Sequence, residues 1–445
     1  MKKILAVLLA AMMTATAFAG CGGGDTSSQT SGEPSNGGSS AATEEIKGSI
    51  VPDSYFGDEN NAVLKVWAPD ATVDLVKTQV EDFKKAYPNK TFDISVVAQG
   101  ENDAATQILN DATVAADVFG FPSDQLNKLV EAGVIAPVAF VDQVNAMNDP
   151  VTVKAGTLKN AEGEDTLYAY PETKDNGYYL VYDNTVVTDE DAKTLEGTLE
   201  ACKKAGKKFI MNAGDGFYAC TFAFTAGAKV DGFEEEDGMT QKFVEFDEDD
   251  AVKTLMAFAK LIKDYKGTFT SLDIANINSG FVNGTCGAGI DGSWNTSVNQ
   301  TALGDKFGAA KLPTINVDGT DKQLVSMFGY KYLGVNGSSQ FPRTAQILAY
   351  YLHGAECQLQ RAEKIGWGPS NTEIQKNEVV TSSAALQAIA AQAENAVVQV
   401  NIASTFWNPM GNLGNKLIAD DWKADDEAAT RKLLQETITN VRDEG

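Results

Sequence analysis

Apolar residues recur at strand and helix spacing over residues 60–140 and predict alternating strands and helices. In TVDLVKTQVEDFKKAYPNK the apolar positions from Val73 to Tyr87 are separated by 3, 4, 3 and 4 residues, which marks one face of an amphipathic helix ended by Pro88. The runs AVLKVWAP, TFDISVVA and DVFGF predict strands, and NDAATQILNDATVAA and SDQLNKLVEAG predict helices, the latter with Ser123 as N-cap and Gly133 as stop. Such alternation is typical of parallel βα units and predicts an α/β protein.

The rest of the chain also predicts strands and helices, and the C-terminal half contains more of them. TLYAYPETKDNGYYLVYDNTVV predicts two strands that flank a polar break at Glu172–Gly177. TLEACKKAG, GFYACTFAFTAGA and DEDDAVKTLMAFAKLIKDYKG predict helices, the last with Asp247 as N-cap, and KKFIMNA, CGAGI and GYKYLGVN predict strands. We expect one long helix over FPRTAQILAYYLHGAECQLQRAEKIG and a largely helical tail interrupted at FWNPMGNLG.

The N-terminus has the pattern of an exported lipoprotein. Residues 1–20 combine a basic start, an apolar run and a small-residue exit, which predicts a signal peptide, and FAGC is similar to the bacterial lipobox, with Cys21 as the lipid attachment site. Residues 22–45 contain no aromatic or branched apolar side chain, so we expect a flexible tether over 21–58. The expected location is the extracellular face of the bacterial cell membrane, reached through the lipid anchor only.

The net charge bears on the kind of binding partner, and the cysteine positions bear on whether disulfides form. The net charge of −25 over 445 residues disfavours nucleic acid and anionic lipid as main partners. Four cysteines follow Cys21, none with CxxC spacing, and their apolar or helical surroundings favour free buried thiols, although secretion permits a disulfide. We expect a monomer.

The motifs of common enzymes are absent from the sequence. His353 is the only histidine, no GxSxG, HExxH or GxxxxGK[ST] occurs, and the acidic run FEEEDGMTQKFVEFDEDD does not match a calcium loop. We therefore expect no enzyme activity, no catalytic residue, no metal and no cofactor. A surface glycosidase with paired carboxylates stays open as an alternative, because the chain has 61 acidic residues.

Aromatic residues in polar, loop-like segments are the strongest functional signal. Trp294 lies in DGSWN, Trp407 in STFWNPMGN, Phe217 and Tyr218 in GDGFYAC, and Phe121 precedes Asp124 in FGFPSD. Aromatic faces cover the C–H face of a sugar ring, and short polar side chains hydrogen-bond its hydroxyl groups. Together these segments favour a saccharide cleft over simple packing.

Along its mature body the chain resembles the extracellular solute-binding proteins of ABC transporters, specifically the maltose/maltodextrin-binding group. The resemblance rests on VLKVWAPD, DVFGFPSDQLNKLVEAGVIAPV, LYAYPETKDNGYYLVYDN, NAGDGFYACTFAFTAGA, FVNGTCGAGIDGSWNTS and STFWNPMGN. It implies sugar contacts from Asp70, Phe121, Asp124, Glu172 or Asp175, Asp215, and Phe217 or Tyr218, with Trp294 and Trp407 as stacking residues. Gln125 stands where the family often has arginine, and an expected tyrosine falls near Ile274.

The resemblance also implies an architecture and a mechanism. We expect a two-lobed periplasmic-binding-protein-like fold with a hinge and an interlobe cleft, with lobe one over 59–172 plus 332–378 and lobe two over 178–326 plus 380–445. Closure around maltose or a malto-oligosaccharide would present the ligand to membrane permease subunits. Another oligosaccharide, or a non-sugar solute such as a peptide or polyamine, is the alternative ligand.

Overall fold

The computed structural model describes residues 48–233, 241–244 and 247–443. The predicted signal peptide, Cys21 and most of the tether therefore lie outside the described residues. These described residues all belong to one compact unit. Within the described residues, none of the helices combines the length and the apolar character needed to cross a membrane.

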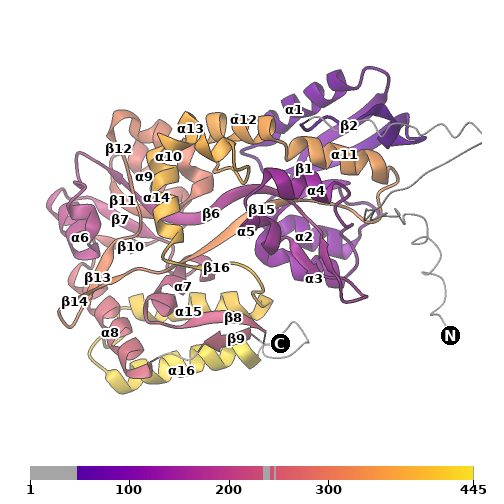
Figure 1. The fold of residues 1–445 in the computed structure, drawn as a ribbon. Helices are drawn as coiled ribbons and strands as arrows, with labels where there is room; N and C mark the ends of the chain where they lie inside the picture. Colours follow the sequence, from indigo (N-terminus) through magenta and orange to yellow (C-terminus); the bar gives the residue numbers. More distant parts are fainter. Residues whose placement is uncertain (1–47, 234–240, 245–246, 444–445) are drawn as a thin grey trace, which may run out of the picture. The chain divides into compact units, whose positions relative to one another are not determined.

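Strands and helices alternate through most of the chain (Figure 1). The strands are β1 (Asn61–Ala68), β2 (Thr91–Ala98), β3 (Val118–Pro122), β4 (Thr157–Lys159), β5 (Asp165–Leu167), β6 (Tyr170–Asp183), β7 (Lys208–Met211), β8 (Lys229–Phe233), β9 (Gln241–Val244), β10 (Phe269–Ser271), β11 (Cys286–Gly292), β12 (Phe307–Ala310), β13 (Thr314–Val317), β14 (Thr320–Gln323), β15 (Ser326–Val335) and β16 (Ala396–Val398). The helices are α1 (Val73–Ala86), α2 (Glu101–Asn110), α3 (Leu126–Glu131), α4 (Val141–Met147), α5 (Pro150–Ala155), α6 (Leu195–Lys204), α7 (Gly216–Thr225), α8 (Glu248–Asp264), α9 (Ala275–Val282), α10 (Thr296–Leu303), α11 (Pro342–Leu352), α12 (Ala355–Ile365), α13 (Glu378–Thr381), α14 (Ala384–Ala393), α15 (Trp407–Ile418) and α16 (Glu427–Asp443).

Among the described residues, ten strands form one mixed sheet. Its main path runs β10-β7-β11-β6-β15-β3-β1-β2, while β12 pairs with β6 and β16 pairs with β15. The strands β1, β2 and β3 are parallel to one another, as are β7, β10 and β11. The long strands β6 and β15 pair antiparallel between these two parallel sets. The sheet therefore presents the carboxyl ends of two sets of parallel strands.

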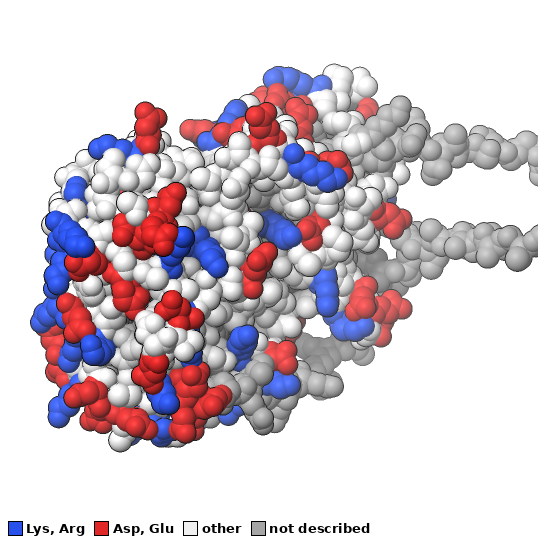
Figure 2. Space-filling model, turned by 60° about the vertical axis from the view of Figure 1, so that its left-hand side comes forward, with Lys and Arg blue, Asp and Glu red and all other residues white. Residues whose placement is uncertain are grey.

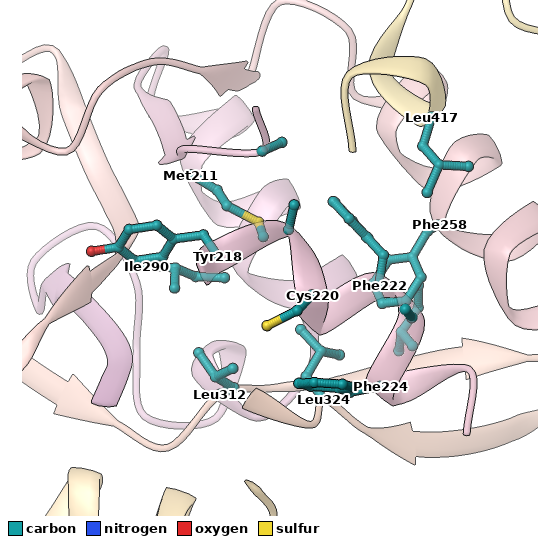
Figure 3. Packing of buried hydrophobic residues seen from close by; sticks show 14 of the residues in the cluster. Met211, Tyr218, Cys220, Phe222, Phe224, Phe258, Ile290, Leu312, Leu324 and Leu417 are labelled. Atoms are coloured by element: carbon teal, nitrogen blue, oxygen red, sulfur yellow. The ribbon is translucent and has the colours of Figure 1, made fainter. Parts of the chain in front are cut away.

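Three clusters of buried apolar side chains flank the sheet. One surrounds α7, whose residues from Tyr218 to Thr225 are all buried, and Figure 3 shows part of it around Cys220, Phe222 and Phe224. A second contains Phe121 and Tyr332, and a third contains Phe83 and Tyr350. Because α7 is apolar on all sides, it packs between α15, α8 and strand β15 rather than lying on the surface.

All four described cysteines are free and buried, which confirms the expectation of unpaired thiols. Burial raises the pKa of the Cys202, Cys220 and Cys357 thiols to about 12. These thiols therefore stay protonated at neutral pH and behave as small apolar side chains.

Several sequence expectations were wrong in detail. The predicted break at Glu172–Gly177 lies inside the continuous strand β6, because β15 pairs along its length and buries polar and apolar residues alike. The segment FWNPMGNLG begins helix α15 rather than interrupting one. Ser123 caps no helix, since its Oγ donates to the Gln399 carbonyl at 2.5 Å and a short 3-10 turn, η2 (Ser123–Gln125), precedes α3.

The long helix expected over residues 341–366 is two helices, α11 and α12. They separate at His353 and Gly354, where a Cβ on Gly354 would lie 1.7 Å from the Ser49 Oγ. His353 is fully buried, and its Nδ1 lies 2.6 Å from the Tyr350 carbonyl oxygen. Burial lowers the pKa of His353 to about 3, so the ring is neutral and has a structural role.

Candidate functional site

A cavity of about 650 Å³ lies where the chain leaves the carboxyl ends of six strands. Segments that follow β1, β2 and β3 line one side, and segments that follow β7, β10 and β11 line the other. In α/β sheets ligands bind outside the carboxyl ends of parallel strands, because loops from several strands converge there. The lining residues are Pro69, Ala71, Gly100, Glu101, Asn102, Asp103, Pro122, Asp124, Gln125, Asn176, Asp215, Phe217, Tyr218, Ile274, Trp294, Asn295, Lys331, Trp367, Gln399 and Trp407.

Three half-buried aromatic rings form one wall of this cavity. The centroid of Phe217 lies 5.8 Å from that of Trp294 and 6.3 Å from that of Trp407, with tilted planes. The rings come from α7, from the short turn η4 (Ser293–Asn295) after β11, and from the first residue of α15. The rings are held near one another while each keeps accessible surface.

The start of α7 fixes two members of this aromatic wall. Asp215 is the N-cap, and its Oδ1 accepts a hydrogen bond from the Phe217 N–H at 2.8 Å. A Cβ on Gly216 would lie 2.1 Å from the Trp407 carbonyl oxygen, so only glycine lets α7 and α15 approach this closely. The Asp215 carboxylate and the rings of Phe217 and Trp407 are thereby brought to one edge of the cavity.

The Trp294 ring is positioned by the residues just before it. A Cβ on Gly292 would lie 2.3 Å from the indole, so the ring folds back over this glycine. The buried Asp291 carboxylate accepts hydrogen bonds from the Gly292 N–H at 2.8 Å, Asn295 Nδ2 at 2.9 Å and Asn299 Nδ2 at 2.6 Å. These bonds tie both sides of the turn that carries Trp294 to one buried group.

Carboxyl groups line the side of the cavity formed after β2 and β3. Glu101 and Asp103 lie in the first turn of α2, and Asp124 lies in η2. Asp124 accepts hydrogen bonds from Gln399 Nε2 at 3.0 Å and Gln125 Nε2 at 2.5 Å. Loss of hydration in the cavity wall raises the pKa of Asp124 to about 7, so this carboxyl titrates near neutral pH.

Lys331 is the one basic residue on the cavity wall among the described residues. It lies in the middle of β15, and its Nζ lies 2.7 Å from Glu101 Oε2. The ammonium group also lies 3.8 Å from the centroid of the Trp367 ring and 5.8 Å from that of Trp294. Sequence reasoning missed this group, although a single lysine in the otherwise uncharged run SMFGYKYLGV signals a buried charge that needs a partner.

Six residues predicted from the sequence lie on the cavity wall: Asp124, Asp215, Phe217, Tyr218, Trp294 and Trp407. Ile274 also lines it, at the position where the resemblance led us to expect a ring. The residues that sequence reasoning missed, besides Lys331, include Glu101, Asn176, Asn295, Trp367 and Gln399.

The other predicted contacts are not among the residues that line the cavity. Asp70 is exposed between the lining residues Pro69 and Ala71. Phe121 is fully buried, with its ring centroid 5.8 Å from that of Tyr332, because alternation along β3 turns it into the second apolar cluster.

The two acidic candidates of β6 are also buried behind the cavity. Asp175 accepts a hydrogen bond from the Gly368 N–H at 2.6 Å, and burial raises the pKa of its carboxyl to about 6. Glu172 lies 3.4 Å from Arg361, and neither side chain lines the cavity. Both carboxyl groups serve the packing of the sheet in this structure.

The described residues provide no group of three or more His, Cys, Asp or Glu side chains arranged to hold a metal ion. On the face shown in Figure 2, acidic and basic side chains are interspersed rather than gathered into one patch.

The lining residues make the cavity a polar and aromatic pocket, and its volume is typical of sites that bind small molecules.

Comparison with known proteins places this fold and cavity in context. The family model described as bacterial extracellular solute-binding protein matches residues 78–388. No curated protein sequence matches the chain significantly.

Solved structures share the fold at low sequence identity. The maltodextrin-binding protein MalE1 from L. casei BL23, without ligand, is 24% identical with a TM-score of 0.70, covering 86% of this chain and 99% of that one. The Thermus thermophilus maltotriose-binding protein, bound with maltotriose, is 18% identical with a TM-score of 0.69, covering 86% and 99%. The GacH receptor of Streptomyces glaucescens GLA.O is 17% identical with a TM-score of 0.68, also covering 86% and 99%.

The family match spans more than half of the chain, and the mixed α/β fold is that of the periplasmic-binding-protein-like maltose-binding structures. Members of this family are receptors that bind a solute without transforming it. The chain belongs to the family of bacterial extracellular solute-binding proteins, the non-enzymatic receptors of ABC transporters.

Proposed function

We propose that this protein captures maltose and malto-oligosaccharides in the cavity beside Phe217, Trp294 and Trp407. The observation that carries the proposal is the meeting of three half-buried rings with several carboxyl groups in one cavity. A pyranose ring offers apolar C–H groups on its faces and hydroxyl groups around its edge. Rings can cover the first while carboxylates and amides hydrogen-bond the second.

The structural relatives support the same class of ligand. They are a maltodextrin-binding protein, a maltotriose-binding protein and a receptor that forms a complex with acarbose, which is a saccharide analogue. Two aromatic contacts that the resemblance implied are missing from the cavity. Ile274 stands where an aromatic ring was expected, and Phe121 is fully buried and has no surface at the cavity. We therefore expect these contacts to be supplied by other wall residues, and another oligosaccharide is the main competing ligand.

We propose the lobe boundaries expected from the sequence, with residues 59–172 plus 332–378 in lobe one and 178–326 plus 380–445 in lobe two. Under this division the rings Phe217, Trp294 and Trp407 belong to lobe two, while Glu101, Asp103 and Asp124 belong to lobe one. The long strands β6 and β15 each cross a boundary, so they would form part of the hinge. Closure would bring carboxyl groups onto a sugar stacked on the rings.

The proposed setting is a lipid-anchored receptor at the outer face of the cell membrane. Cys21 would carry the lipid, residues 21–58 would form the tether, and the closed, loaded protein would deliver its sugar to ABC permease subunits. Globomycin, an inhibitor of lipoprotein signal peptidase, tests the anchor, since it should make unprocessed precursor accumulate. Normal processing in its presence would contradict the anchor without affecting the proposed ligand.

The test of the ligand is titration calorimetry of the mature protein against maltose, maltotriose, maltotetraose and unrelated oligosaccharides. We expect micromolar binding of at least one malto-oligosaccharide, which corresponds to about 8 kcal/mol. Trp294→Ala should weaken binding at least about tenfold, the scale of a well-packed aromatic contact. Trp422→Ala is the matched control, because Trp422 is also half-buried but does not line the cavity. If no malto-oligosaccharide gives a measurable heat of binding, the proposal is overturned.

A further inference from the structure

The wall of the cavity carries an unequal set of charges. Glu101, Asp103, Asp124 and Asp215 contribute four carboxyl groups, against the single ammonium group of Lys331 among the described residues. Of the described residues on the wall, Lys331 alone carries a positive charge that could attract a solute carboxylate. What surrounds Lys331 therefore decides whether acidic solutes can bind.

Lys331 is shielded from the cavity by the groups that bind it. Its side chain is only 4% exposed and that of Glu101 only 13%, and the two are joined at 2.7 Å between Nζ and Oε2. The Trp367 ring covers the ammonium group at 3.8 Å, and Trp367 itself is 2% exposed. Cation–π contact and the ion pair together satisfy this charge inside the protein.

The backbone holds this pair in place from two sides. Lys331 is paired with Pro122 of β3 and with Thr173 of β6, in the middle of the sheet. The Glu101 carboxylate lies over Gly120 of β3, where a Cβ would be 3.6 Å from both Cγ and Oε1. The ammonium group therefore has little freedom to turn toward a solute while Glu101 is charged.

Two further carboxyl groups lie behind the pair, on β6. Glu172 lies 3.4 Å from Arg361, and Asp175 accepts from the Gly368 N–H, so each has a closer partner, although both also attract the Lys331 ammonium group at longer range. Neither lies within 4 Å of the Lys331 ammonium group among the described ion pairs, and neither lines the cavity. On the solute side, Glu101 is the group that neutralises Lys331.

We propose that the Glu101–Lys331 pair determines the charge selectivity of the cavity, by hiding the one cation that the described residues place on its wall, so that uncharged saccharides bind and acidic ones are rejected. The inference rests on the proposed saccharide function and goes beyond it. Glu101 acts as the masking residue, and selectivity arises from repulsion by the remaining carboxyl groups as much as from attraction of the correct ligand.

The test compares two ligands of the same length, maltotetraose and maltotetraose with the terminal C6 oxidised to a carboxylate. The wild-type protein should bind the neutral ligand at least about tenfold more tightly, because like charges disfavour the acid. Glu101→Gln keeps the size of the side chain but removes the carboxylate that is paired with Lys331 on the cavity side. It should reduce the neutral-to-acid affinity ratio by about tenfold or more, the scale of one opposite charge at 4–6 Å.

Two further variants separate the proposed role from general effects. Asp103→Asn removes one negative charge from the same wall and the same helix, but Asp103 has no ion pair with Lys331, so the ratio should change much less. The double variant Glu101→Gln with Lys331→Met removes the cation as well and should restore the preference for the neutral ligand. A purely structural role would weaken both ligands in parallel and leave the ratio unchanged.

The outcomes also distinguish this inference from the proposed function. If the wild-type protein binds no neutral saccharide, the proposed function fails and this inference fails with it. If maltotetraose binds but Glu101→Gln shifts the ratio no more than Asp103→Asn, only the charge-selectivity inference is overturned. Thermal melting of each variant without ligand confirms that the comparison is made on folded protein.

Discussion

Asn295 Nδ2 donates a 2.9 Å hydrogen bond to the Asp291 carboxylate, and this bond spans the turn that carries Trp294. Asp291 is fully buried and is the next-to-last residue of β11, whereas Asn295 lies on the cavity wall. Burial raises the pKa of Asp291 to about 6, from an ordinary value of 3.8. The position of the proposed stacking ring thus depends on one buried, titratable group.

We predict opposite behaviour for two substitutions of Asp291. Asp291→Ala leaves the Gly292 N–H and the Asn299 amide without acceptors, at a cost of about 1–3 kcal/mol for each buried group. Asp291→Asn should be much milder, because Asn299 Oδ1 has no partner among the described residues and a turned Asn299 amide can accept from the new NH₂ group. Urea unfolding at pH 7 measures both, and equal losses would contradict the role given to Asn299.

Comparison of the wild-type protein with Asp291→Asn also tests how the free energy of unfolding depends on pH. Since the folded-state pKa of Asp291 is raised above its unfolded value, the folded state holds a proton that the unfolded state releases between about pH 4 and 6. The contribution of this group to stability is therefore present at about pH 4 and is lost as the pH rises through about 6. Asp291→Asn should flatten that part of the profile of unfolding free energy against pH, and an unchanged slope would refute the assignment.

Asp124 predicts a pH dependence of ligand binding. Its pKa of about 7 in the ligand-free protein means that the carboxyl is half protonated near neutral pH. A sugar hydroxyl that donates to the carboxylate favours the ionised form, so affinity should be about tenfold lower at pH 6 than at pH 8. Calorimetry at several pH values measures this, and Asp124→Asn should remove the dependence. Tighter binding at pH 6 would mean that the protonated carboxyl is the group that contacts the ligand.

The tryptophans predict a fluorescence response to ligand. Trp294, Trp367 and Trp407 line the cavity, while Trp67 and Trp422 do not. The double variant Trp67→Phe with Trp422→Phe should keep the ligand-induced change in emission. Replacement of both Trp294 and Trp407 by phenylalanine should remove most of it. A response that persists in the second variant and disappears in the first would place the ligand elsewhere.

We predict that a substitution of Gly216 will disturb both the packing of α7 against α15 and the binding of sugar. A Cβ there would lie 2.1 Å from the Trp407 carbonyl oxygen, so Gly216→Ala must push α7 and α15 apart. We expect a loss of about 1–3 kcal/mol in stability and weaker sugar binding, because Phe217 and Trp407 are displaced together. Gly337→Ala is the control, since the nearest atom to its added Cβ would be 3.5 Å away. Equal effects of the two substitutions would contradict the packing argument.

Local patterns predicted much of the fold. The expected apolar face is reproduced in α1, where Val76, Val80 and Phe83 are buried, and Asp247 caps α8 as expected, accepting from the Asp250 N–H. Hydrophobic periodicity succeeds where one face of an element is buried. It fails for β6 and for the division between α11 and α12, because these depend on partners distant in sequence, β15 and Ser49.

The sequence predicted those site residues whose chemical character differs from that of their neighbours in the chain. Trp294, Trp407 and Phe217 are large apolar residues beside short polar residues in the sequence, and each lies at the cavity. Glu101 resembles any acidic residue in the first turn of a helix, and its pairing with Lys331 joins positions 230 residues apart. Such a pair follows from sheet order and register, which a single sequence does not reveal.

The central position of β15 also bears on the order in which the protein folds. This strand, at residues Ser326–Val335, pairs with β3, β6 and β16, so the middle of the sheet cannot be completed until about three quarters of the chain has been synthesised. Pairings between such distant segments form slowly, since long loops must close before the contacts are gained. A nascent chain of this kind stays open for longer than one built from local contacts.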